Sequence, residues 1–252
     1  MTRRKFLNLL AVGGISAISL PLLGSYKASE FYFTQLIYRG EWDPRPRAFK
    51  RLMTNLDLRT SIKSSFERKE LEIESLELFH FPFLYLAGRE TFEPFSENER
   101  KRLRKFLNLG GTLLIDDVSG EENSTFDNQI REELQNIFPE HTLSRIPKDH
   151  VVYKSFYLLN IPSGRRIIHP YLEGITFDEE ERTSVIYSRN DLGGAWSDDE
   201  LGKWEFECIP GGEVQRELAF RTGINIIMYA LTGNYKKDQI HAPFINRRQM
   251  NL

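Results

Sequence analysis

Residues 79–120 read FHFPFLYLAGRETFEPFSENERKRLRKFLNLGGTLLIDDVSG, and this stretch predicts a strand, a loop, a helix, a second strand and a polar turn. The apolar, aromatic run over 79–87 is typical of a strand buried on both faces, as in a parallel sheet. The run over 112–115 predicts a second buried strand. Two buried strands joined by one helix predict a parallel crossover, and therefore an α/β fold with a mostly parallel sheet flanked by helices.

Short motifs indicate both ends of the helix between these strands. Ser96 and Glu99 form a capping box, in which each side chain accepts a hydrogen bond from the backbone N–H of the other. Gly110 and Gly111 provide a left-handed stop. The helix has one apolar face, formed by residues at helical spacing: Leu103, Phe106 and Leu107.

The rest of the chain alternates between strands and helices in the same way. We expect a strand over 31–38, a helix after Pro46, a helix over 126–137, a strand over 183–188 and a helix over 218–231. Residues 58–62 and 71–73 predict a short strand and a segment that leads to the central strand. These elements predict a single α/β domain over 29–236, followed by a C-terminal tail over 237–252.

Two polar turns follow predicted strands, and they are the candidate site. Asp116, Asp117 and Ser119 follow the strand over 112–115, and Arg189 and Asp191 follow the strand over 183–188. In open α/β sheets, ligands bind in the crevice beyond the carboxyl ends of the strands. We therefore expect the two turns to meet at one edge of the sheet.

Further candidate ligand-binding residues come from segments near these turns: Arg39, Trp42, Arg131, His150 and Trp196. Trp42 either packs at a helix entry or stacks on a ligand. Arg131 lies close in sequence to the acidic turn and pairs with it, or has only a structural role. The acids of the loop over 120–127 lack a repeating oxygen-ligand pattern, which favours a solvated loop and a helix cap.

Asp149 and His150 form an adjacent acid–histidine pair, which raises the proton affinity of an imidazole and fixes its ring. The alternative is a histidine at the surface or at a helix cap. The remaining histidines show no HExxH or HxH spacing, so a zinc site is not predicted. We expect no cofactor, because neither a dinucleotide-binding loop nor a Gly-Lys-Ser/Thr phosphate loop is present.

The chain opens with a segment that is typical of an export signal. Thr2, Arg3, Arg4, Phe6 and Leu7 resemble the twin-arginine signature, and an uncharged apolar run follows over 9–24. That run is shorter than a membrane span of about 20 residues and has its charge on the N-terminal side, as signal peptides do. Residues 1–28 therefore predict an export signal or, if it is not cleaved, an inner-membrane anchor. The alternative is a buried first helix.

Composition excludes several classes of function. The formal net charge is −2, and no basic block lies outside the signal and the helix segment over 101–105, so nucleic acid is not an expected partner. The single cysteine, Cys208, excludes an internal disulfide and a cysteine-cluster metal site. Its apolar neighbours favour a core residue over a nucleophile.

Several motifs together resemble the bacterial domain of unknown function 4159 family: RGEWD at 39–43, FPFLYLAG at 81–88, LNLGGTLLIDD at 107–117, PKDH at 147–150 and YSRNDL at 187–192, followed by Trp196. More distantly, the chain is similar to the class I glutamine-amidotransferase-like, flavodoxin-type fold. Members of that superfamily carry a nucleophilic cysteine in the segment that corresponds to 113–120. This chain has Asp116, Asp117, Val118 and Ser119 there, so amidotransferase chemistry is not implied.

Two hypotheses for function follow. The first is a non-catalytic exported domain, periplasmic or anchored in the inner membrane, that binds a cell-wall ligand or an envelope protein at the polar turns. Its only membrane contact is the N-terminal segment, if that segment is not cleaved. The second is a hydrolase in which Asp116 or Asp117 acts with His150, and Arg189 stabilises developing charge. The hydrolase requires Asp117 and His150 to lie within hydrogen-bond reach.

Overall fold

The computed structural model describes residues 30–177 and 182–232, and the compact unit that contains the fold begins at Phe31. The predicted export signal over 1–28 and the predicted C-terminal tail over 237–252 lie outside the described residues. The elements, in chain order, are β1 (Thr34–Ile37), α1 (Ala48–Arg59), β2 (Lys69–Glu72), the short 3₁₀ helix η2 (Leu76–His80), β3 (Phe83–Gly88), α2 (Glu97–Asn108), β4 (Thr112–Asp117), α3 (Thr125–Ile137), β5 (Ser144–Arg145), the 3₁₀ helix η3 (Val151–Tyr153), β6 (Glu173–Phe177), β7 (Arg182–Ser188), α4 (Leu192–Trp196) and α5 (Gly212–Thr232).

The described strands form one mixed sheet in the order β2-β1-β3-β4-β7-β6-β5. The pairs from β2 to β7 are parallel, whereas β6 and β5 add an antiparallel edge. The five parallel strands thus follow the order 2-1-3-4-5, which occurs in doubly wound α/β folds. The predicted fold class, a mostly parallel sheet flanked by helices, is confirmed.

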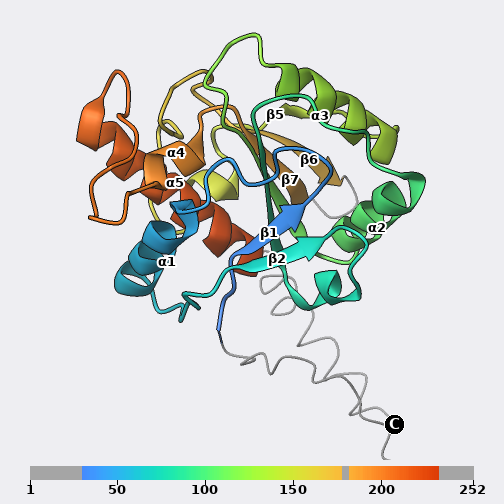
Figure 1. Cartoon of the computed structure of the whole chain (residues 1–252), viewed down its shortest axis with the longest axis horizontal. Coiled ribbons are helices and arrows are strands. Elements are labelled where there is room, and N and C mark those ends of the chain that lie inside the picture. The colour runs from blue at the N-terminus through green and yellow to red at the C-terminus, as the bar shows by residue number, and fades with distance from the viewer. Residues whose placement is uncertain (1–29, 178–181, 233–252) are drawn as a thin grey trace, which may run out of the picture. The chain divides into compact units, whose positions relative to one another are not determined.

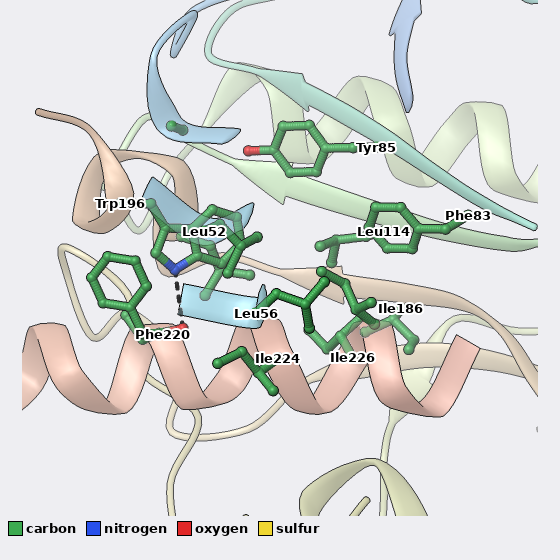
Figure 2. Close-up of a cluster of buried hydrophobic side chains, with 14 of the residues drawn as sticks. Leu52, Leu56, Phe83, Tyr85, Leu114, Ile186, Trp196, Phe220, Ile224 and Ile226 are labelled. Carbon is green, nitrogen blue, oxygen red and sulfur yellow. Dashed lines mark hydrogen bonds between the residues drawn. The ribbon is translucent and has the colours of Figure 1, made fainter. Parts of the chain in front are cut away.

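Helices cover both faces of the sheet (Figure 1). Helices α1, α4 and α5 contact one another on one face, and α2 contacts α3 on the other. Two apolar cores result, one on each face. Figure 2 shows the first core, in which Trp196 and side chains of α1 and α5 pack against β3, β4 and β7.

The capping motifs define the helices as predicted. Ser96 and Glu99 make both hydrogen bonds of the capping box at the start of α2. Ser124 accepts a hydrogen bond from the Asp127 N–H at the start of α3, so the loop before it does supply a helix cap. Residues 58–62 do not form the short strand that we predicted, because α1 continues to Arg59.

Two further differences concern the strands. Residues 76–80 form η2 rather than the start of the central strand, because the Ser75 side chain accepts a hydrogen bond from Glu77 and initiates a helical turn. The antiparallel strands β5 and β6 were not predicted. Within the described residues, no helix combines the length and apolarity needed to cross a bilayer.

Candidate functional site at the carboxyl edge of the sheet

Strands β4 and β7 end side by side, because Asp116 is in register with Ser188. The two polar turns therefore meet at one edge of the sheet. Successive side chains of a strand point to opposite faces, so Asp116 and Asp117 enter different surroundings. Each carboxylate lies in its own cluster of buried charges, and we describe the two clusters in turn.

The first, the Asp116–Asp191 cluster, also contains Tyr85, Arg45 and Arg165. Asp116 accepts hydrogen bonds from the Tyr85 hydroxyl (2.7 Å) and from the backbone N–H groups of residues 192 and 193 (2.9 and 2.8 Å). Asp191 accepts from the Arg45 Nε and Nη2 atoms (3.0 and 2.8 Å) and from Arg165 Nε. Both aspartates are fully buried. Asp191 thus pairs with two guanidinium groups, whereas a hydroxyl and two backbone N–H groups hold Asp116.

Backbone geometry adds a constraint at Asp191. Its φ of 53° lies in the left-handed region, which Asp and Asn tolerate better than other residues with a side chain. Its carboxylate also accepts a hydrogen bond from the Gly194 N–H (2.8 Å) and caps α4. Asp191 therefore fixes the turn, the helix and two arginines at once, which is a structural role.

Asp116 has an unusual proton affinity for an aspartate. Burial, followed by the nearby Asp191 carboxylate, raises the pKa of Asp116 to about 7, against the hydrogen bonds that it accepts. Its oxygens are nevertheless occupied by hydrogen-bond donors of the protein. A carboxylate held in this way has no free oxygen for a substrate.

The second, the Asp117–Arg189 cluster, lies on the other face and also contains Asp127, Arg131 and Glu173. Arg189 Nε is 3.6 Å from Asp117 Oδ2, and Arg189 Nη1 is 3.5 Å from Asp127 Oδ2. Arg131 donates one hydrogen bond to Asp127 (2.9 Å) and two to Glu173 (3.1 and 2.7 Å). Burial raises the pKa of Asp117. The cluster therefore joins the ends of β4 and β7 to α3 and β6.

This second cluster leaves hydrogen-bonding capacity unused. Among the described residues, five buried side-chain atoms lack a hydrogen bond, and three of them are Asp117 Oδ2, Arg189 Nε and His169 Nδ1. His169 Nδ1 lies 3.7 Å from Glu173 of the same cluster. Buried polar groups without hydrogen bonds are rare in native proteins and call for an explanation. A polar ligand or a water molecule that both donates and accepts hydrogen bonds would satisfy Asp117 and Arg189 together.

The loop before β6 lies over this edge. Asn190 holds it, because its side chain accepts hydrogen bonds from the N–H groups of residues 168 and 169 and donates to the carbonyls of Pro162 and His169. Gly120 permits the close approach: its φ is +70°, and a Cβ there would lie 2.7 Å from Arg165 Nη2. The segment that carries Arg165 thus packs against the turns that follow β4 and β7.

Ser119, Arg131, Arg189 and Asp191 lie at this edge with the two aspartates, although Arg131 pairs with Asp127 and Glu173 rather than with the acidic turn. The N–H of Ser119 donates to Asp117 Oδ1 (2.9 Å). Sequence reasoning missed Arg45, Arg165, Asp127, Glu173 and His169. Asp127 could have been identified from the sequence, because it lies in the first turn of the predicted helix that follows β4.

Three other residues that the sequence suggested as ligand-binding candidates lie in surroundings that give them a structural role. Trp196 is fully buried, and its indole N–H donates to the Ala219 carbonyl (3.1 Å), so it cannot form a wall of an open site. Arg39 binds Glu93 and Glu99 at the start of α2. Trp42 is half-buried against the second core, which agrees with a packing role.

His150 lies away from the aspartates. Its Nδ1 atom accepts a hydrogen bond from the Val152 N–H (3.1 Å), and its Nε2 atom is 3.1 Å from Thr183 Oγ1. Thr183 is near the amino end of β7, five residues before Ser188, which corresponds to roughly 16 Å along a strand. Asp117 and His150 therefore do not come together, and the hydrolase that required this pair has no geometric basis.

Cys208 lies near the Asp116–Asp191 cluster, because the N–H of the next residue, Ile209, donates to the carbonyl of Arg165 (2.9 Å). Cys208 is buried, and burial raises the pKa of its thiol. In the part of the chain that the structure describes, no group of three or more His, Cys, Asp or Glu side chains is arranged to hold a metal ion.

These features define an α/β domain with helices on both faces of a mostly parallel sheet and two clusters of arginine and carboxylate side chains at its carboxyl edge. A family model described as Domain of unknown function (DUF4159) matches residues 32–231, well over half of the chain. The chain therefore belongs to the DUF4159 family, in agreement with the resemblance noted in its sequence. No curated protein matches the chain.

Proposed function

We propose that this protein is an exported domain of the cell envelope that binds a polar ligand or a partner protein at the carboxyl edge of its sheet and catalyses no reaction. The binding groups are Asp117, Arg189 and His169 of the Asp117–Arg189 cluster. The Asp116–Asp191 cluster is the rigid support beside them. The protein faces the periplasm, either free or held by its N-terminal segment.

The observation that carries this proposal is the contrast between the two clusters. Asp116 and Asp191 have their oxygens occupied by hydrogen-bond donors of the protein, whereas Asp117 Oδ2 and Arg189 Nε are buried without a hydrogen bond. Binding sites retain such unmet capacity because the ligand supplies the missing partner. A hydroxyl or amide group, as in cell-wall glycans and peptides, both donates and accepts, and so it fits an acceptor beside a donor.

The proposal includes the fold type. The parallel strand order 2-1-3-4-5 supports a class I amidotransferase-like, flavodoxin-type fold. In that comparison, the turn from Asp116 to Ser119 stands where the amidotransferases carry their nucleophilic cysteine. At this position the chain has a carboxylate whose oxygens accept hydrogen bonds from the protein. This supports a fold that keeps the position of the superfamily's active site but not its thiolate chemistry.

The proposal is tested by measuring the melting temperature of the full chain with and without peptidoglycan fragments of defined composition. Binding to the folded state raises stability, and a fragment at about 100 times its Kd adds about 2.7 kcal/mol, or roughly 5–10 °C in a protein of this size. We expect such a shift for the wild type and little or none for Asp117→Asn, which replaces a carboxylate oxygen beside Arg189 with an N–H donor. Asp149→Asn, an exposed change beside His150, is the matched control and keeps the shift.

A partner protein is tested in the same way, with a photoreactive residue in place of Glu122, an exposed residue whose carbonyl accepts from Arg189 (2.7 Å). We expect a specific crosslink to an envelope protein that is lost in Asp117→Asn. If no fragment shifts the wild type and no crosslink forms, the binding function is wrong. Equal shifts in the wild type and in Asp117→Asn would place the ligand elsewhere.

A further inference from the structure

The segment that joins β5 to β6 encloses a cavity of about 370 Å³. We call it the loop cavity, and its lining includes two prolines and the side chains of Lys148, Tyr153, Leu159, Asn160, Ile161 and Tyr171. The ring of Tyr171 stacks on that of His169, with 4.7 Å between the ring centres. The loop cavity therefore adjoins the Asp117–Arg189 cluster. Its volume is within the range of roughly 300–1,000 Å³ that is typical of small-ligand pockets.

Two fully buried asparagines hold the walls of the loop cavity. Asn190, in the turn after β7, donates to the carbonyls of Pro162 (3.3 Å) and His169 (2.7 Å). Asn225 of α5 accepts hydrogen bonds from the N–H groups of residues 156 and 157 and donates to the carbonyls of residues 152 and 157. The walls are thus fixed by the core of the domain, and a preformed pocket lowers the entropic cost of binding.

The charge around the loop cavity is positive. Segment 144–171 contains five Lys or Arg residues and one acid, Asp149, although the whole chain has a net charge of −2. None of the residues that line the cavity is acidic. Arg145 lies over the Tyr171 ring, 4.4 Å from its centre, and neither Arg145 nor Lys148 forms an ion pair within the described residues. The cavity therefore offers unneutralised cations to an anionic ligand.

The uncharged polar side chains of the lining supply further hydrogen-bond donors. Tyr153 is only 5% exposed, and its hydroxyl accepts from the Leu172 N–H (2.9 Å) but donates to no described residue. The Asn160 amide and the Tyr171 hydroxyl also have no acceptor in the described part of the chain. A buried donor without an acceptor is costly, and a ligand with acceptor oxygens would satisfy it. A carboxylate combines such oxygens with a negative charge.

From these observations we propose that the loop cavity binds the free C-terminus of a short peptide. Lys148 and Asn160 hold the terminal carboxylate, and an aliphatic side chain of the last residue lies against Leu159 and Ile161. The peptide backbone continues to the Asp117–Arg189 cluster, where its amide groups both donate and accept. This inference rests on the proposed function, because it names the class of ligand that binds at this edge of the sheet.

Fluorescence anisotropy of the full chain tests the inference with two probes. Each is a tetrapeptide of three alanines and a C-terminal leucine, labelled at its amino end. One probe has a free C-terminal carboxylate and the other a C-terminal amide, so they differ in charge but hardly in shape. We expect the acid to bind about 10 to 100 times more tightly than the amide, because hydrogen bonds to charged groups are the stronger ones. Added salt should reduce this preference.

Three variants of exposed residues assign the preference to the loop cavity. Lys148→Gln should bring the affinities of the two probes to within about threefold of each other, since it removes the cation but keeps a donor. Lys50→Gln, the same change on α1, is the matched control and should keep the full preference. Ile161→Ser should weaken both probes by similar factors, because it removes apolar contact and no charge.

The outcomes separate this inference from the proposed function. Equal affinities of the two probes in the wild type, or an unchanged preference in Lys148→Gln, would overturn the carboxylate site. If neither probe binds, but peptidoglycan fragments stabilise the wild type and not Asp117→Asn, the proposed function stands and the peptide terminus is the wrong ligand. If the acid probe binds through Lys148 and Asp117→Asn has no effect on either ligand, the loop cavity is a site of its own and the proposed function fails.

Discussion

Asp191→Ala should lower the free energy of unfolding by about 3–5 kcal/mol, because it removes one side of a buried ion pair. The side chain of Arg45 is 5% exposed and that of Asp191 is fully buried, so water cannot replace the lost carboxylate. The change also removes the hydrogen bond that caps α4 and places alanine at a φ of 53°. Urea denaturation followed by circular dichroism measures the loss.

The matched control removes an exposed ion pair. Glu93 binds Arg39 at 3.0 Å, and the two side chains are 72% and 46% exposed. Exposed pairs contribute little, so Glu93→Ala should cost no more than about 1 kcal/mol. Similar losses in the two variants would show that the buried pair is not a principal support of the carboxyl edge.

Trp196→Ala should be comparably destabilising, by about 3–5 kcal/mol, because it leaves a large cavity in the first core. Trp196 is fully buried between Tyr85 and α5, where Figure 2 shows it beside Phe220 and its indole hydrogen bond to the helix backbone. Differential scanning calorimetry measures this loss. At a permissive temperature, binding at the carboxyl edge should persist, since Trp196 belongs to the core and not to the site.

Trp204 provides the comparison for this variant. It is 38% exposed and lies against Arg51 and Phe220, so Trp204→Ala opens no closed cavity and should cost less. If Trp196→Ala unfolded at the same temperature as the wild type, Trp196 could not be the central core residue that its burial indicates.

The sequence predicted those parts of the fold that depend on local signals. The capping box at Ser96 and Glu99 defined α2, because it satisfies backbone donors within one turn of chain. The polar turns after β4 and β7 were also predictable, since buried parallel strands must end where polar residues begin. β5 was not, because a two-residue strand has no periodicity to detect.

The composition of the two clusters depends on contacts between distant segments. Arg45 and its partner Asp191 lie 146 positions apart, and no pattern near either residue indicates the pair. The same limit applies to Glu173, which reaches the second cluster only because β6 runs antiparallel to β7. The alternation of side chains along a strand explains why Asp116 and Asp117 point to opposite faces. It does not indicate which of them would keep an oxygen that accepts no hydrogen bond.

The central claim is that the Asp117–Arg189 cluster binds a ligand and that the Asp116–Asp191 cluster stabilises the fold beside it. The most direct test compares the free energy of unfolding of Asp117→Asn with that of Asp191→Asn. Arg189 keeps Asp127 and the carbonyls of Glu121 and Glu122 when Asp117 is neutralised. We predict a change within about 1 kcal/mol for Asp117→Asn, because asparagine keeps an oxygen for the Ser119 N–H and burial, which raises the pKa of Asp117, disfavours its charge. We predict a loss of about 3 kcal/mol for Asp191→Asn. Equal, large losses in both variants would show that both clusters are structural and would contradict the binding site.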